Sequence, residues 1–176
     1  AVRIDTVPSA GNLTLAGVAV TAGQVVSVTD ITAGRLVFTP TANATGAGYA
    51  SLTFSVRDSN NAYDTAPNTL TVNVTAVNDA PVDLGLSANT VAENAATGTV
   101  VGTVSGTDPD ASDTKTYSLT DTAGGRFTID ANTGQLTVAN GSLLNYEASA
   151  SHTVTVRVTD SGGLTYDEAF TINLTN

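Results

Sequence analysis

Four segments of this chain alternate apolar and polar residues with a period of two. They are SLTFSVRD (51–58), TLTVNVTAV (69–77), HTVTVRVTD (152–160) and EAFTINLT (168–175). In an extended chain the Val, Leu, Ile and Phe residues then share one face, and Thr, Ser, Asn and Arg share the other. This pattern predicts strands in antiparallel sheets that have one buried and one hydrated face. Sixteen glycines and five prolines interrupt the pattern, so no helix longer than a turn or two is predicted.

The alternating pattern occurs twice along the chain. Residues 31–75 align with residues 130–175, and the alignment matches Leu36 to Leu136 at an offset of about 100 residues. A repeat of this length indicates tandem domains rather than one large domain. We therefore predict an all-β chain of two tandem β-sandwiches of the immunoglobulin-like, Greek-key type.

The composition limits how each domain is stabilised and what it can bind. Aromatic residues make up only 5% of the chain, so each core must consist mainly of Val, Leu, Ile and Ala. Cysteine is absent, which excludes disulfides, thiolate metal sites and cysteine nucleophiles. The net charge of −10 opposes binding to nucleic acid or anionic lipid. No run of about 18 apolar residues occurs, so we expect no insertion into a membrane.

The negative charge is concentrated in the C-terminal part of the chain. Residues 80–176 contain eleven acids and three bases, whereas residues 1–79 contain five acids and three bases. Most acids of the C-terminal part lie where a predicted strand meets a loop, in the segments AEN (92–94), TDPDASD (107–113), LNYE (144–147) and VTDSGG (158–163). In a β-sandwich such loops gather at the two ends of the domain.

Several carboxylates at one end of a sandwich require a positive partner. Two carboxylates about 4 Å apart repel by about 4 kcal/mol at an effective dielectric constant of about 20, and Lys and Arg are too few to neutralise them. Calcium fits, because it binds roughly six to eight oxygens from carboxylates, amides and carbonyls. A chain without cysteine and with one histidine disfavours zinc and copper. The acids therefore predict a calcium site.

Some acids are explained more simply as turn residues, because Asp and Asn accept hydrogen bonds from nearby backbone amides in turns. We assign Asp64, Asp121 and Asp130 to turns, and the acids on either side of Pro109 to metal binding. The only histidine, His152, begins a predicted strand, and we expect it on the hydrated face. Ser-His-Asp catalysis needs the histidine in a pocket with an oriented acid, so we do not expect an enzyme.

Seven short motifs occur in the order and spacing of a cadherin repeat: VNDAP, VAEN, GTVSGTDPDASD, YSL, FTIDANTGQLTV, LLNYEAS and VRVTDSGG. The span from about Asn78 to Asn176 resembles one whole repeat, and residues 1–76 resemble a related module more loosely. The richness in Ala, Thr and Gly and the NDAP segment resemble bacterial cadherin-like modules, which occur in tandem in large surface adhesins, including those of the repeats-in-toxin group. The resemblance implies a divergent cadherin-like domain (1–76), a calcium-binding linker (77–82) and a cadherin repeat (83–176).

The resemblance also implies which residues bind calcium. The matching positions at the N-terminal end of the second domain, which would face the first domain, are Asn78, Asp79, Asp108, Asp110 and Asp160, with Asp113 as a weaker addition. At the opposite end they are Glu93 and Glu147, which would meet the linker to a following module. The family usually has Asp at the positions of Ala76 and Asn145, so each of these departures removes one negative charge. We therefore expect fewer ions than at a full cadherin junction.

Together these inferences predict a structural and adhesive function. Calcium at the junction would stiffen tandem repeats of an extracellular, bacterial cell-surface adhesin, and other domains would bind a cell-surface or biofilm ligand. The expected partners are neighbouring repeats of the same chain, and the isolated fragment should be a monomer. The alternative is a recognition module that binds a peptide, a glycan or a second copy of itself through an exposed apolar patch or an open strand edge.

Overall fold

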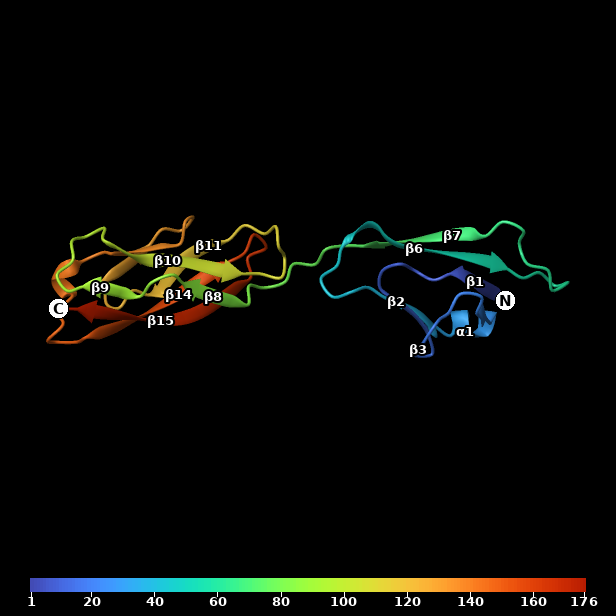
Figure 1. Ribbon diagram of the computed structural model, residues 1–176, viewed down its shortest axis with the longest axis horizontal. Coiled ribbons are helices and arrows are strands. Elements are labelled where there is room, and N and C mark those ends of the chain that lie inside the picture. Colours follow the sequence, from blue (N-terminus) through green and yellow to red (C-terminus); the bar gives the residue numbers. More distant parts are fainter. The chain divides into compact units, whose positions relative to one another are not determined.

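The computed structural model describes all 176 residues, and strands account for nearly all of its regular structure (Figure 1). The chain divides into two compact units, unit 1 (Ala1–Val77) and unit 2 (Asn78–Asn176). Each unit consists of two β-sheets with an apolar core between them, which confirms the predicted all-β fold class. None of the helices has the length and apolar character that crossing a membrane requires.

Unit 1 is built from seven strands and one short helix. These are β1 (Val2–Thr6), β2 (Asn12–Leu15), β3 (Val18–Ala19), β4 (Val25–Val26), α1 (Val28–Thr32), β5 (Leu36–Thr39), β6 (Gly46–Val56) and β7 (Asn68–Val74). One sheet has the order β4-β1-β6-β7 and the other β3-β2-β5. All neighbouring strands in both sheets are antiparallel, as the alternating pattern predicts.

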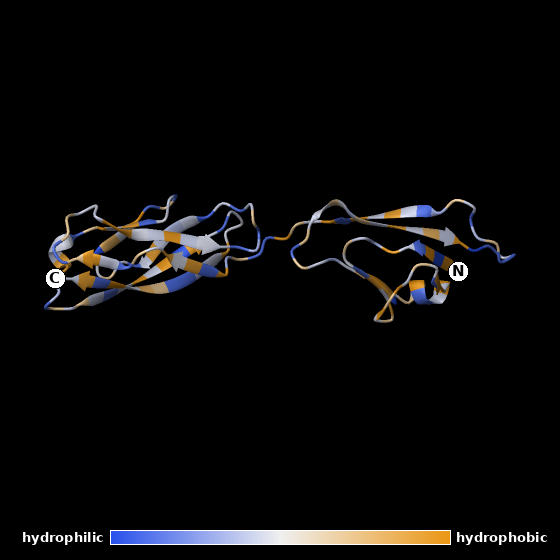
Figure 2. Cartoon of the chain, viewed as in Figure 1, coloured by the Kyte–Doolittle hydropathy of each residue, from blue (hydrophilic) through white to orange (hydrophobic).

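The core of unit 1 is small. Its buried cluster consists of Ile4, Leu13, Val20, Val26 and Leu52. Other apolar residues of the alternating segments are poorly covered: Val56 in β6 is 43% exposed and Leu70 in β7 is 50% exposed. The strands carry the alternation of apolar and polar residues that the sequence predicts (Figure 2). The apolar face is only partly covered, because β7 lies at the edge of its sheet and the opposing sheet has three strands.

Unit 2 is built from eight strands and one 3₁₀ turn. These are β8 (Asp83–Leu86), β9 (Thr90–Ala92), β10 (Val100–Thr107), β11 (Thr116–Asp121), β12 (Phe127–Ile129), β13 (Gln135–Val138), η1 (Gly141–Leu143), β14 (Ser151–Thr159) and β15 (Thr165–Thr175). One sheet has the order β12-β13-β10-β8 and the other β11-β14-β15-β9. Only β9 departs from antiparallel pairing, because it runs parallel to β15.

Unit 2 has a continuous core to which both sheets contribute. In β14 the side chains of Val154, Val156 and Val158 are 0% exposed, as the period of two predicts. His152 has the same phase as these valines, and it is half-buried rather than on the hydrated face. Our expectation that His152 lies on the hydrated face was therefore wrong. β14 begins at Ser151, so His152 is already part of the strand and lies on the same inward-facing side as Val154.

The strand registers bring three loops to one end of unit 2. β10 ends at Thr107, opposite Asp83 at the start of β8, and β14 ends at Thr159, opposite Thr116 at the start of β11. We call this the N-terminal end of unit 2. It is formed by residues 78–82, 108–115 and 160–164.

Candidate metal centre

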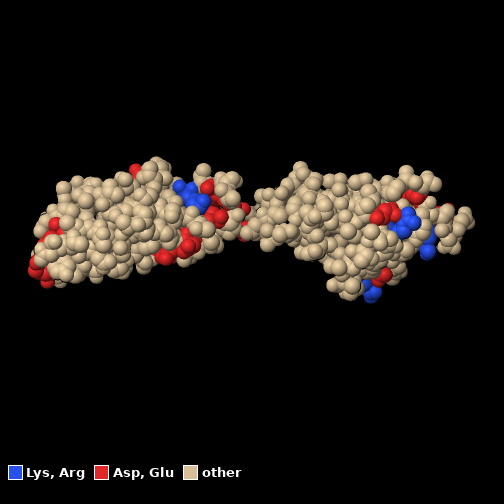
Figure 3. All heavy atoms as spheres, viewed as in Figure 1, with Lys and Arg blue, Asp and Glu red and all other residues tan.

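Three carboxylates gather at the N-terminal end of unit 2. Asp108 and Asp113 lie in the loop that follows β10, and Asp160 directly follows β14. Each offers one oxygen atom, and the three atoms lie within 4.8 Å of one another. Figure 3 shows that acidic side chains of unit 2 gather towards both of its ends. The structure thus brings together three of the residues that the sequence predicts for this end.

The Asp-Pro-Asp segment forms a hydrogen-bonded turn. The Oδ1 atom of Asp108 accepts a hydrogen bond from the backbone nitrogen of Asp110 at 2.8 Å. The Oδ2 atom of Asp110 in turn accepts one from the backbone nitrogen of Asp79 at 2.8 Å. Such turns are the local structure that Asp favours. Asp110 therefore holds the segment that precedes β8 and lies outside the group of three carboxylates.

Asp160 is the most deeply buried acid of the group, with 6% of its surface exposed. Its Oδ1 atom accepts a hydrogen bond from the backbone nitrogen of Leu164 at 2.7 Å, which closes the turn between β14 and β15. Its Oδ2 atom accepts one from Nδ2 of Asn78 at 2.8 Å. A side chain at Gly162 would collide with Asn78, so glycine at this position permits the contact. Asn78 is thus held beside the carboxylates.

Asp113 is held by Ser161, a residue that the sequence analysis missed. Asp113 accepts hydrogen bonds from the hydroxyl and the backbone nitrogen of Ser161, the latter at 3.1 Å. The hydroxyl hydrogen bond is the largest cause that lowers the pKa of Asp113 below its ordinary value, and burial acts in the opposite direction. The only signal for Ser161 was its position directly after Asp160, because the contact spans two loops.

One carboxylate oxygen of the group has no protein partner. The Oδ2 atom of Asp108 is buried and accepts no hydrogen bond. A buried polar atom of this kind costs about 1 to 3 kcal/mol, and more when it is charged. Because no two of these three oxygens are more than 4.8 Å apart, each pair of carboxylates also repels by at least roughly 3 kcal/mol at an effective dielectric constant of about 20. The cost of the oxygen without a partner and the repulsion between the carboxylates both favour binding of a cation among the three oxygens.

The donors of the group fit a hard divalent cation. The ammonium of Lys115 contacts the backbone carbonyl of Asp113 at 3.3 Å, and the structure shows no salt bridge between a base and the three carboxylates. All the ligand atoms on offer are oxygens, which calcium prefers. Asp108, Asp113 and Asp160 could therefore hold calcium through their carboxylates, and the side chain of Asn78 lies beside them, with its nitrogen donating to Asp160.

The acids predicted for the opposite end of unit 2 form a looser arrangement. The Oε2 atom of Glu93 accepts a hydrogen bond from the backbone nitrogen of Tyr146 at 3.1 Å, so Glu93 lies beside the LNYE segment. Glu147 accepts a hydrogen bond from the side chain of Asn176 at 3.4 Å. The structure brings no third carboxylate to this pair, because Asn145 stands in the same segment and uses its oxygen to accept from Ala148.

Two of the three acids that we assigned to turns, Asp121 and Asp130, accept hydrogen bonds from backbone amides two or three residues further along the chain. Asp130 accepts hydrogen bonds from the backbone of Asn132 and Thr133 and from the hydroxyl of Thr133. Asp121 accepts one from the backbone nitrogen of Ala123. Their oxygens stabilise local structure, and neither residue approaches the group of three carboxylates. Asp64 does not form a turn of this kind: it accepts hydrogen bonds from the backbone nitrogen of Val56 in β6 and from the side chain of Asn68.

Known proteins resemble unit 2 most clearly. The family model described as "Cadherin domain" matches residues 88–175, which is half of the chain. The human protein "Cadherin-related family member 2" is 40% identical over 89 residues, a match that covers 48% of this chain and 7% of that protein. The chain therefore spans a small fraction of this relative's length.

Solved structures share the fold. The crystal structure of chicken VE-cadherin EC1-2 is 28% identical, with a TM-score of 0.52, over 72% of this chain and 66% of that one. The crystal structure of mouse cadherin-23 EC22-24 matches 94% of this chain and 50% of that one, with a TM-score of 0.62 and 21% identity, and shows likeness of fold alone. The family model, the relative and the fold agree, and the chain belongs to the cadherin domain family.

Proposed function

We propose that unit 2 is a calcium-stabilised cadherin module, and that calcium at its N-terminal end restricts the segment that connects it to unit 1. Cadherin domains are adhesion modules, and they generally bind calcium. The observation that carries the proposal is the group formed by Asp108, Asp113 and Asp160, in which one buried carboxylate oxygen has no partner.

Each residue of the N-terminal end has a role in this proposal. Asp108, Asp113 and Asp160 hold the ion and supply three negative charges, which the ion neutralises. Asn78 and Asp79 belong to the connecting segment, and they are already hydrogen-bonded to Asp160 and Asp110. Binding of the ion removes repulsion among the carboxylates that anchor this segment, so the segment loses freedom when calcium is present.

The same reasoning extends to the opposite end of unit 2. Glu93 and Glu147 lie on neighbouring segments there, since Glu93 accepts a hydrogen bond from Tyr146. We assign these two residues to half of a second calcium site. The missing ligands would come from the linker of a following module.

The wider setting is an extracellular, bacterial surface adhesin of tandem repeats. Its support is the sequence: the absence of cysteine, the richness in Ala, Thr and Gly, and the NDAP segment at the start of unit 2. Extracellular modules often bind calcium with a dissociation constant of about 10⁻⁴ to 10⁻³ M, so the site fills outside the cell and stays empty in the cytosol. The segment that connects the two units would therefore become stiffer only after the protein has been secreted.

Calorimetry with and without calcium tests the proposal. At about one hundred times the dissociation constant, bound calcium should add about 2.7 kcal/mol to the free energy of unfolding of unit 2. For a domain of this size the melting temperature should rise by roughly 10 to 20 °C. The variants Asp108→Asn and Asp160→Asn should lose most of this rise.

Asp130→Asn is the matched control, because it makes the same chemical change at an acid that forms a turn. It should keep the full response to calcium. A scan with a chelator that coincides with a scan in calcium at about one hundred times this dissociation constant, roughly 10 to 100 mM, would contradict the proposal.

A further inference from the structure

Lys115 is the only lysine of the chain, and it ends the acidic loop between β10 and β11. The other two bases of unit 2 have partners elsewhere. Arg157 forms a salt bridge with Asp167, and Arg126 donates hydrogen bonds to two backbone carbonyls in the loops at the opposite end of the unit. Within unit 2, the positive charge beside the three carboxylates therefore comes from Lys115.

The side chain of Lys115 is held in place by packing and by one hydrogen bond. The residue is half-buried, and its aliphatic stem crosses β10 at Gly106, where an added Cβ atom would lie 3.3 Å from Cδ of the lysine. The ammonium at the end of the stem donates to the backbone carbonyl of Asp113 at 3.3 Å. Lysine commonly packs its stem on the protein and keeps its charge in water. Here the packed stem keeps the charge at the N-terminal end of unit 2.

The ammonium acts on the carboxylates through its charge and does not occupy a ligand atom. It bonds to a backbone carbonyl, and no salt bridge joins it to Asp108, Asp113 or Asp160. The hydrogen bond from Ser161 is the largest cause that lowers the pKa of Asp113, and the charge of Lys115 lowers this pKa further. The lysine thus stabilises the negative charge of the group while the carboxylate oxygens keep their own partners.

We propose that Lys115 sets the calcium affinity of the N-terminal end of unit 2: its charge stabilises the calcium-free form and weakens calcium binding. The inference rests on the calcium site of the proposed function. Without the ion, the ammonium is attracted by three negative charges. A bound divalent ion leaves only one of these charges uncompensated, so the attraction decreases when calcium binds, and this loss opposes binding.

The size of the effect follows from Coulomb's law. A single positive charge within roughly 10 Å of a divalent ion raises the dissociation constant of that ion by about fourfold in a medium as polar as water. Salt weakens such an interaction, because the screening length falls from about 30 Å at 0.01 M salt to about 3 Å at 1 M salt. The effect of Lys115 should therefore be large at low salt and small at high salt.

A calcium titration of Lys115→Met tests the proposal, because methionine keeps an unbranched stem and removes the charge. Nuclear magnetic resonance can follow the backbone amides of Ser161 and Leu164, which donate to Asp113 and Asp160 and so report on this end of unit 2 alone. At about 0.01 M salt the dissociation constant should fall by about fourfold or more, and at about 1 M salt the difference should nearly vanish. Lys115→Arg keeps the charge and should bind calcium like the unmodified chain.

The unfolding of unit 2 in urea separates a role of the charge from a role of the packed stem. In chelator, Lys115→Met should lower the unfolding midpoint, because the carboxylates lose their counter-charge. In saturating calcium the midpoint should fall less. A lysine that only packs would lower both midpoints equally and leave the dissociation constant unchanged, and that result would overturn the proposal.

Arg126→Met is the matched control. It also replaces a base of unit 2 with methionine, but Arg126 lies in the loop between β11 and β12, at the opposite end of the unit. It should leave the calcium response of the Ser161 and Leu164 amides unchanged. A fall in the dissociation constant equal to that of Lys115→Met would overturn the proposal, since the effect would then come from the net charge of the unit.

The titration also separates this inference from the proposed function. If calcium shifts the two amides in the unmodified chain and Lys115→Met has the same dissociation constant at low salt, the role of Lys115 is wrong and the calcium site stands. If the amides of the unmodified chain do not shift in up to about 100 mM calcium, the site itself is wrong, and the role of Lys115 fails with it.

Discussion

Ser55 is 0% exposed near the C-terminal end of β6 and donates its hydroxyl hydrogen to Asp5 at 2.6 Å. Arg3 donates to the other oxygen of Asp5 at 2.7 Å, so three polar side chains satisfy one another in unit 1. The hydrogen bond from Ser55 is the largest cause that lowers the pKa of Asp5, burial opposes it, and Arg3 lowers the pKa further. The charged form of Asp5 is therefore the form that stabilises the folded unit.

This arrangement predicts how stability depends on pH. Because the folded pKa lies below the unfolded value of about 3.9, the contribution of Asp5 is present above that pH. It is lost as the pH falls through the folded pKa. The variant Asp5→Asn cannot titrate, so the unfolding midpoint of unit 1 in urea should fall less steeply between about pH 5 and pH 2 than in the unmodified chain. Ser55→Ala should also flatten the profile, and equal slopes in all three proteins would contradict the assignment.

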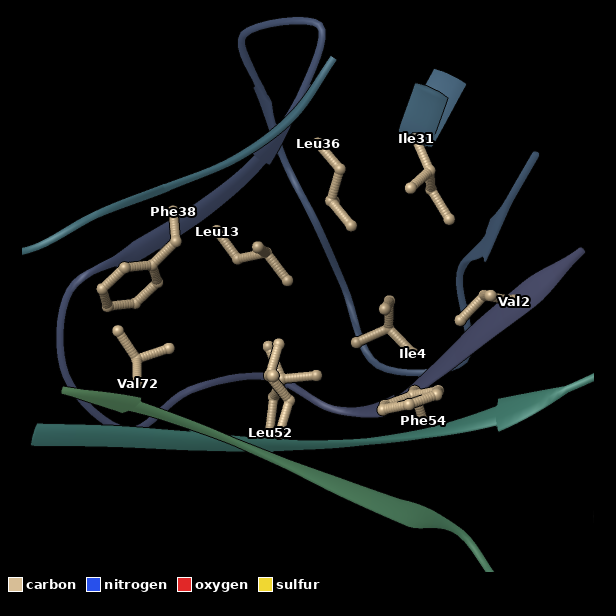
Figure 4. Close-up of a pocket in the computed structure, with 10 residues that line it drawn as sticks. Val2, Ile4, Leu13, Ile31, Leu36, Phe38, Leu52, Phe54 and Val72 are labelled. Atoms are coloured by element: carbon tan, nitrogen blue, oxygen red, sulfur yellow. The ribbon is translucent and has the colours of Figure 1, made fainter. Parts of the chain in front are cut away.

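At the scale of strands, the same core position has different surroundings in the two units. Leu136 in β13 is 0% exposed between the neighbouring strands β12 and β10, whereas Leu36, which aligns with it in the sequence, is half-buried in β5, the last strand of its sheet (Figure 4). Leu136→Ala should lower the free energy of unfolding of unit 2 by about 2 to 5 kcal/mol. Leu36→Ala should cost unit 1 clearly less, because a half-exposed leucine has less contact to lose. Chemical denaturation followed by hydrogen exchange in each unit measures both values. Equal costs would mean that the face of Leu36 is covered in solution.

At the scale of the whole molecule, the proposed calcium site acts on the freedom of the units relative to each other. Small-angle scattering should show a narrower distribution of overall dimensions in calcium than in chelator. The double variant Asp108→Asn with Asp160→Asn should keep the broad distribution in both conditions. The chain should remain monomeric throughout. Calcium-dependent dimers would favour a recognition module over a spacer.

Much of the fold was predictable from the period of two. The four alternating segments correspond to β6, β7, β14 and β15, the longest strands of their units. The short strands β3 and β4, with two residues each, are too brief to show a period. The parallel pairing of β9 with β15 was also not predicted, because alternation says which face a residue occupies and says nothing of the strand beside it.

The candidate site was predicted as a set of acids, and the structure divides that set. Asp108 and Asp160 lie in one group, as the resemblance to a cadherin repeat implies, and Asp113 belongs to it although we ranked it lower. Asp110 instead accepts a hydrogen bond from Asp79. Motif spacing places residues in the same loops, but the direction of each carboxylate depends on contacts between loops. The proposed roles of these residues in calcium binding stay predictions.

The sequence by itself determined the properties that depend on near neighbours. These are the strands with one apolar face, the tandem repeat, and an excess of acids at loop positions in the second half. Tertiary structure alone decided that Asp108 keeps a buried oxygen without a partner, and that β5 and β7 keep one side without a strand. The physical reason is that both properties depend on which distant segments pack together: Asp113 meets Ser161 across two loops, and the side of β5 that is open in unit 1 is covered by β10 on β13 in unit 2.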